Sequence, residues 1–101
     1  MAKLNIVLTD LVYNLPYLAA EVLEGETKDV ASASADTFFT NILTPSGGPS
    51  LMTVSPAEDM FISIATSPDA SVDDKRRLVF GGDSQTFLVS GGKTVSARLS
   101  T

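Results

Sequence analysis

The chain has 101 residues, of which 44% are hydrophobic and 19% charged, and this composition predicts one globular domain rather than a disordered segment. It contains no cysteine and no histidine, which excludes disulfides, thiolate nucleophiles and any serine-histidine or cysteine-histidine catalytic system. The formal net charge of −5 argues against a nucleic-acid partner, because affinity for a phosphate backbone depends on lysine and arginine.

Residues 1–36 are predicted to form an N-terminal arm or extension that precedes the main domain. Leu4, Ile6 and Leu8 recur at every second position, which places them on one face of an opening strand. Residues 18–24 fit either a short helix or a further strand, because their apolar side chains satisfy both periods. No apolar stretch here reaches the length of a signal peptide or a membrane helix, so we expect synthesis in a cytoplasm and no membrane partner.

An apolar segment broken by Pro16 follows the opening strand. Tyr13 and Tyr17 flank this proline. Together with the neighbouring leucines they present more hydrophobic surface than a compact monomer of this size readily covers. We therefore predict that the segment is buried against copies of the chain or against a lattice partner. The residues expected at this interface are Leu11, Tyr13, Leu15 and Tyr17.

Residues 37–101 are predicted to form the main domain, and the fold class expected is mainly β: an antiparallel sandwich or barrel with one short helix at most. Short runs rich in β-branched and aromatic residues recur along it, bounded by turn residues. Two Gly-Gly pairs, 81–82 and 91–92, offer the positive φ angles of tight hairpins, so the strands after Asp59 are expected to share one sheet system. The predicted strands are residues 38–43, 51–54, 60–66, 78–80, 86–89 and 94–99.

The phenylalanines fall at strand positions, where packing in the core is the default expectation. A platform on which a ligand ring stacks is the less favoured alternative. This expectation covers Phe38, Phe39, Phe61, Phe80 and Phe87.

Residues 73–77 form the densest charge cluster, two aspartates followed by a lysine and two arginines. The aspartates could ligate calcium, but they lack the spacing of an EF-hand loop, and a solvated loop between strands is the simpler interpretation. The basic residues could meet an acidic protein surface, with Lys93 and Arg98 nearby, and a subunit contact through Arg76 and Arg77 is favoured over nucleic acid. No catalytic residue, cofactor site or metal site is predicted, and we do not expect an enzyme.

Residues 59–65 and 78–98 follow the order strand, strand, Gly-Gly, strand, Gly-Gly, strand. In this the second half of the chain resembles the closing strands of small β-sandwich virion proteins of tailed bacteriophages. The resemblance implies a non-enzymatic subunit made in the host cytoplasm and located in the virion, most specifically a head-decoration (cement) protein. It also implies binding to the major capsid protein or other virion proteins, and a homo-oligomer with a trimer favoured. Two alternatives stay open: a neck or tail accessory protein, and a small ligand-binding or carbohydrate-binding β module.

Overall fold

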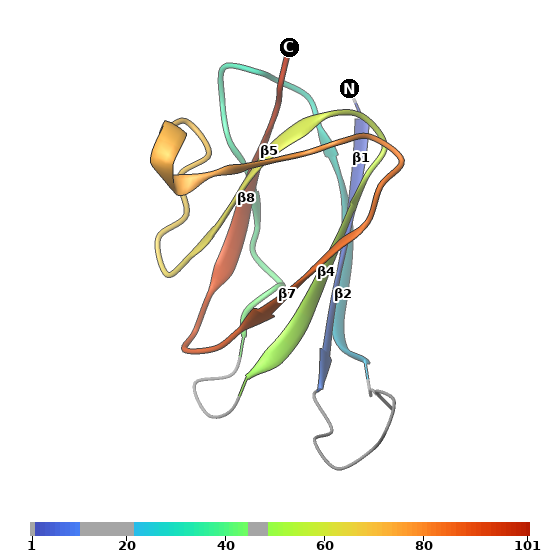
Figure 1. Cartoon of the computed structure of the whole chain (residues 1–101), viewed down its shortest axis with the longest axis vertical. Coiled ribbons are helices and arrows are strands. Elements are labelled where there is room, and N and C mark those ends of the chain that lie inside the picture. Colours follow the sequence, from blue (N-terminus) through green and yellow to red (C-terminus); the bar gives the residue numbers. More distant parts are fainter. Residues whose placement is uncertain (1, 11–21, 45–48) are drawn as a thin grey trace.

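The structure is a computed structural model that describes residues 2–10, 22–44 and 49–101. It confirms the mainly β fold class, because the described residues form two antiparallel sheets packed face to face as a sandwich (Figure 1). β1 begins and β8 ends at the same end of the molecule (Figure 1). The strands are β1 (Ala2–Asp10), β2 (Val22–Val30), β3 (Thr37–Phe39), β4 (Ser50–Pro56), β5 (Met60–Ala65), β6 (Arg77–Val79), β7 (Gln85–Val89) and β8 (Thr94–Leu99), and a 3-10 helix, η1 (Asp73–Lys75), precedes β6.

Sheet A has the strand order β2-β1-β4-β7. β1 lies inside this sheet, with β2 paired on one edge and β4 on the other. The alternation of Leu4, Ile6 and Leu8 predicted this strand, and all three side chains are buried. The described part of residues 1–36 thus supplies two strands of sheet A and does not stand apart from residues 37–101 as an arm.

β2 resolves part of the choice between helix and strand for residues 18–24. From Val22 onward the chain is extended and pairs with β1, so Gly25 lies within a strand and ends no helix. Residues 18–21 lie outside the described residues, as do the interface residues predicted within 11–17.

Sheet B has the strand order β3-β8-β5-β6, and the chain changes layer several times to build it. β5, β6 and β8 lie in sheet B, but β7, which falls between β6 and β8 in the sequence, lies in sheet A. The prediction that the strands after Asp59 share one sheet system is therefore wrong. The two Gly-Gly links carry the chain across the sandwich, because Val79 and Val95 face the core from sheet B while Phe87 faces it from sheet A.

The core lies between the sheets and is built from every second side chain of each long strand. In β4, for example, Met52 and Val54 are buried, whereas the intervening Thr53 is partly exposed on the outer face. The largest completely buried side chains are Phe39, Leu4, Ile6, Leu8, Ile42, Met52, Met60, Ile62, Val30, Val54, Val79 and Val95.

The phenylalanines follow the core expectation only in part. Phe39 is completely buried, and Phe61 and Phe87 are partly buried. Phe38 and Phe80 are 49% and 53% exposed, which corrects the expectation for these two. Phe38 precedes Phe39 in β3, so the period of the strand sends it to the opposite face, and Phe80 follows the end of β6.

The turn after β6 packs tightly against the turn between β4 and β5. A Cβ atom on Gly81 would lie 2.6 Å from the Cα atom of Glu58, so a side chain does not fit there. The Gly81 amide donates to the Asp59 carboxylate at 2.9 Å, and the Gly82 amide donates to the Pro56 carbonyl at 2.9 Å. These contacts fix the point from which the chain crosses to β7.

Candidate binding groove at the open side of the sandwich

One side of the sandwich, between β2 and β3, is closed by polar contacts. Glu26 and Lys28 pair in register with core residues of β1, so both project toward the inner face of sheet A. Lys28 Nζ donates to the Phe38 carbonyl at 2.8 Å, and the Glu26 carboxylate accepts from the Asn41 amide at 3.2 Å. Inward-pointing charges also protect an edge strand against pairing with another chain.

The opposite side, between β6 and β7, is open. β6 has three residues and pairs with Met60–Ile62, so no described strand continues sheet B beside Ser63–Ala65. β7 ends sheet A, and its outer edge has no partner among the described strands. β7 also lacks the usual protection of an edge strand, because its five residues include no charge and no proline.

The two sheets separate between β6 and β7. Because of this separation, solvent reaches the edge of the core through a groove. Ile64, Phe87 and Val89 pack against the core there but remain partly exposed. Two adjoining cavities of about 440 and 420 Å³ make up the groove, and both are lined by Ile64, Arg77 and Phe87. We call this surface the open-edge groove and define it by Ile62, Ile64, Arg77, Phe87, Val89 and Lys93.

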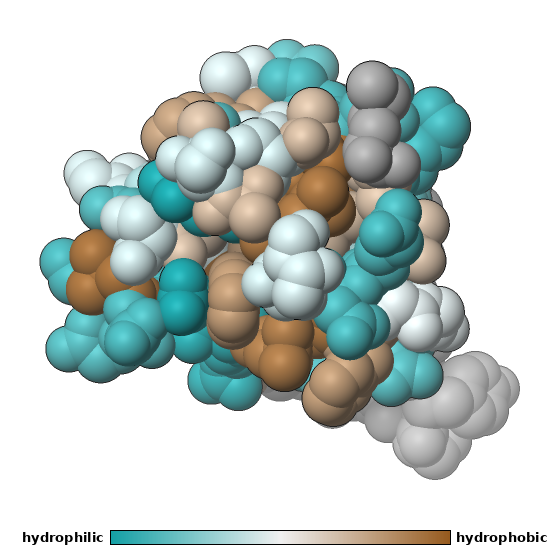
Figure 2. All heavy atoms as spheres, turned by 90° about the horizontal axis from the view of Figure 1, so that it is seen from above, coloured by the Kyte–Doolittle hydropathy of each residue, from teal (hydrophilic) through white to brown (hydrophobic). Residues whose placement is uncertain are grey.

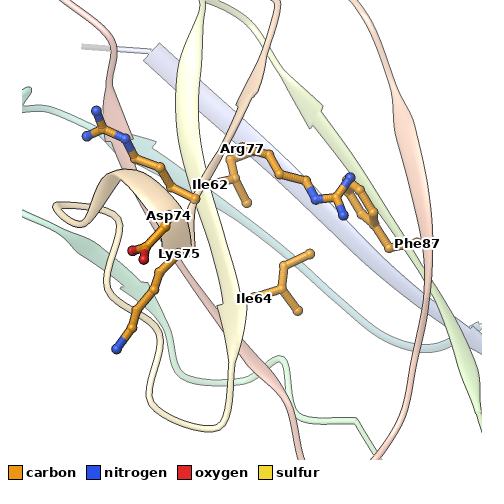
Figure 3. Close-up of a pocket in the computed structure, with 7 residues that line it drawn as sticks. Ile62, Ile64, Asp74, Lys75, Arg77 and Phe87 are labelled. Atoms are coloured by element: carbon orange, nitrogen blue, oxygen red, sulfur yellow. The ribbon is translucent and has the colours of Figure 1, made fainter.

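Arg77 spans the open-edge groove. Its side chain extends from β6 to the ring of Phe87 on β7, with the guanidinium carbon 5.0 Å from the ring centroid (Figure 3). Ile62 and Ile64 project from β5 toward the same gap (Figure 3). A cation over an aromatic face at an exposed site contributes about 0.5 to 1 kcal/mol. Arg77 therefore holds the mouth of the groove in place while its charge faces solvent.

The groove is basic although the protein is acidic. Four of the seven lysines and arginines line the two cavities, against a single acidic residue among those described, Asp74, whereas the whole chain carries a formal charge of −5. The four basic residues are Lys75, Arg76, Arg77 and Lys93. Within the described part of the chain, Arg76 alone among these four forms an ion pair, so most of this positive charge is not neutralised locally.

The loop that carries η1 to the groove is anchored on the outer face of sheet B. The buried Ala70 donates its amide to the Asp36 carboxylate at 3.0 Å, and Asp36 also pairs with Arg98. Asp69 accepts hydrogen bonds from the hydroxyl and the amide of Ser71, and these bonds, helped by the charge of Arg98, lower the pKa of the Asp69 carboxyl. This network positions the start of β6 and with it the basic rim.

Arg76 and Arg77, grouped together by the sequence, have different surroundings. The Arg76 guanidinium lies 3.6 Å from the centroid of the Phe61 ring and donates to the Ala70 carbonyl at 3.1 Å. Arg76 is thus partly buried against the protein, whereas Arg77 is exposed. Arg98, expected near the basic run, lies close to Arg76 on the outer face of sheet B, because it pairs in register with Phe61, on which Arg76 stacks, and it lies away from the groove. The subunit contact through Arg76 and Arg77 stays a prediction, and Arg77 is the better placed of the two for it.

The two aspartates of the charge cluster lie in η1. Asp73 pairs with Arg76 at 2.6 Å, and Asp74 lies beside Lys75 at the edge of the open-edge groove. Among the residues described, no group of three or more acidic, histidine or cysteine side chains is arranged to hold a metal ion. The surroundings of these aspartates match the solvated, charged loop that the sequence favoured.

Several large apolar side chains are exposed, and all of them except Leu88 lie away from the two cavities of the groove. Seen from the end of the molecule at which β1 begins, hydrophobic atoms surface as separate patches between hydrophilic ones (Figure 2). Dispersed single apolar residues are normal on a protein surface, so they mark no binding site by themselves. The exposed large residues are Phe38, Leu43, Leu78, Phe80 and Leu88.

Sequence reasoning found Arg77 and Lys93 but missed the apolar part of the groove. Phe87 was assigned to the core as a strand aromatic, and Ile64 falls within the predicted strand 60–66. Both do face the core, and they are partly exposed because β6 begins only at Arg77, opposite Ile62. The available signal was the uncharged run at 85–89, which is unusual for an edge strand, but the sequence does not show which strands are edges.

Comparisons with known proteins identify no relative of this chain. No protein-family model matches the chain, and neither a curated protein nor a solved structure matches it. In the part of the chain that the structure describes, no helix has the length and apolar character needed to cross a membrane.

Proposed function

We propose that this protein is a non-enzymatic structural subunit that attaches to a protein lattice through the open-edge groove, and that this lattice is the capsid of a tailed bacteriophage. The observation that carries the proposal is the unprotected outer edge of β7 beside an apolar floor and a basic rim. Such a surface suits a protein ligand, because it offers backbone hydrogen-bonding groups and apolar contacts together. The role of capsid decoration is supported by the resemblance of residues 59–65 and 78–98 to the closing strands of phage virion proteins.

Binding to a lattice explains how a contact surface as small as this groove can give firm attachment. One copy buries only a modest area in it, and an isolated contact of that size is weak. Many copies that bind equivalent junctions, above all as a homo-oligomer with several grooves, gain strength through multivalency. The subunit would be made in the host cytoplasm and would reinforce the major capsid protein after joining the virion.

Binding to particles tests the proposal directly. We expect the wild-type protein to sediment with capsids, and Arg77→Glu to bind at least about tenfold more weakly, because the exchange reverses a charge on the rim. Arg77 is exposed and forms no ion pair with a described residue, so the variant should fold normally. Lys3→Glu is the matched control, since Lys3 is exposed on the outer face of sheet A and forms a surface pair with Asp29.

Electron cryo-microscopy of the virion separates the remaining roles. Ordered copies at the symmetric junctions of the head support decoration, and copies at the neck or tail support the accessory role. A protein that leaves the particles unoccupied and binds a glycan instead would refute the proposal and favour the ligand-binding module.

A further inference from the structure

We infer that β7 is the acceptor for an added β-strand, supplied by an extended, acidic segment of a partner polypeptide. This binding mode rests on the proposed function, because it names the chemistry of the partner at the same groove. The three other edge strands are unsuited to the task. β2 turns charged side chains inward and contacts β3, while β3 and β6 have only three residues each.

The groove beside β7 has the place that such a strand needs. Below its pairing with β6, β5 continues through Ser63–Ala65 without a described neighbour on that edge. A strand added to β7 would lie above this gap and continue sheet A. Every second side chain of the added strand would point toward the core side, where Ile64, Phe87 and Val89 are partly exposed. Backbone hydrogen bonds to β7 would supply affinity, and these apolar contacts would supply specificity.

The length of the acceptor sets the length of the ligand. β7 spans Gln85–Val89, about 17 Å at roughly 3.3 Å per residue. An added strand of about five to seven residues therefore covers the edge. Lys93 then lies near the Val89 end of this strand, and Arg77 lies beside its centre, because the guanidinium stacks on Phe87.

Charge distinguishes the partner from a second copy of this chain. If two β7 edges paired, the Arg77 and Lys93 side chains of both copies would gather around one small interface. Like charges in such proximity are destabilising, and in the described part of the rim only Asp74 offsets them. An acidic segment meets the same cations favourably. The partner is therefore a polypeptide segment with apolar residues at alternate positions and carboxylates within reach of Arg77 and Lys93.

Titration with a designed peptide tests the inference. The probe is a synthetic peptide of about nine residues, with alternating valine and threonine in the centre and glutamates at both ends, added to isotope-labelled protein. We expect chemical-shift changes and slowed amide exchange to concentrate in β7, and the affinity to fall as salt rises. A peptide with lysines in place of the glutamates should bind at least about tenfold more weakly, and a central proline should abolish binding.

Charge exchange in the protein provides the matched test. The double variant Arg77→Glu with Lys93→Glu should bind the glutamate peptide more weakly than the wild-type protein does, and it should bind the lysine peptide more tightly. Lys3→Glu, far from the rim, should change neither. If the two peptides bind the wild-type protein equally, if the perturbed amides lie outside β7, or if neither binds, the inference is wrong. Self-association through β7 without any peptide would also overturn it, because a second copy would then be the occupant.

The two proposals fail separately. If the glutamate peptide binds β7 but capsids do not bind the protein, the proposed function fails and the acceptor edge stands. If capsids bind the protein through Arg77 while no peptide reaches β7, lattice attachment stands and strand addition is refuted.

Discussion

Ile6→Ala should destabilise the whole sandwich, because β1 is a central strand and no appendage. Ile6 is completely buried between β2 and β4 on the inner face of sheet A. The substitution removes three carbon atoms from the core, each worth about 0.8 kcal/mol of transfer free energy. The cavity that remains adds to this loss, so we expect a total of about 3 kcal/mol. For a domain of this size that corresponds to a fall in Tm of roughly 12 to 24 °C.

Thermal unfolding followed by far-ultraviolet circular dichroism measures this effect. Val7→Ala is the matched control, because Val7 lies in the same strand but faces outward and is partly exposed. The control should cost less than about 1 kcal/mol. If Ile6→Ala and Val7→Ala melt together, within a few degrees of wild type, then β1 does not form part of the cooperative core and the description of sheet A is wrong.

Four further outcomes are expected. Ile62→Asp should prevent folding, since it places a carboxylate in a buried position between the sheets, and a melting curve like that of wild type would contradict this. Gly81→Ala should lower the free energy of unfolding by about 1 to 3 kcal/mol in a denaturant titration, because its Cβ would overlap the facing backbone. The hydrogen bonds from Ser71 lower the pKa of Asp69, so the stabilisation lost in Asp69→Asn should be present above about pH 3.8 and should disappear as the pH falls through the lowered pKa, which Tm measurements across acidic pH will check. Exchange of the apolar residues within 11–17 for serine should reduce the oligomer mass in light scattering while the fold is retained, and an unchanged mass would remove this segment from the interface.

Most strands could be predicted because each carries its own period. Leu4, Ile6 and Leu8, and likewise Met60 and Ile62, show in isolation which residues share a face. The partners of a strand carry no comparable signal. The alternation in β1 looks the same whether the strand is central or lies in an extension, and so its place between β2 and β4 was missed.

The prediction of which strands share a sheet was wrong for a related reason. A Gly-Gly pair indicates that the chain turns, but both a hairpin and a crossing between layers use such a turn. Gly81 is needed for close packing against the β4–β5 turn, and of the pair only Gly82 has a positive φ angle. The first link therefore does not have the two positive φ angles of a type I′ hairpin.

The charged part of the groove was visible in the sequence, and the apolar part was not. The basic run that contains Arg77 stands out in an acidic chain, and Lys93 was placed near it. Exposure of Ile64 and Phe87 depends on the late start of β6, which begins opposite Ile62, a property of the assembled sandwich. An open core edge of this kind leaves no local pattern, since the same residues would be fully buried if β6 were longer.

Hydrogen-deuterium exchange on the free and the capsid-bound protein tests the central claim most directly. The free protein should exchange rapidly at those amides of Gln85–Val89 that point away from β4, because this edge has no partner among the described strands. Binding to the capsid should slow exchange in this strand, while amides between β1 and β2 stay unchanged. Slowed exchange elsewhere, with β7 exchanging as fast on the particle as in solution, would contradict attachment through the open-edge groove.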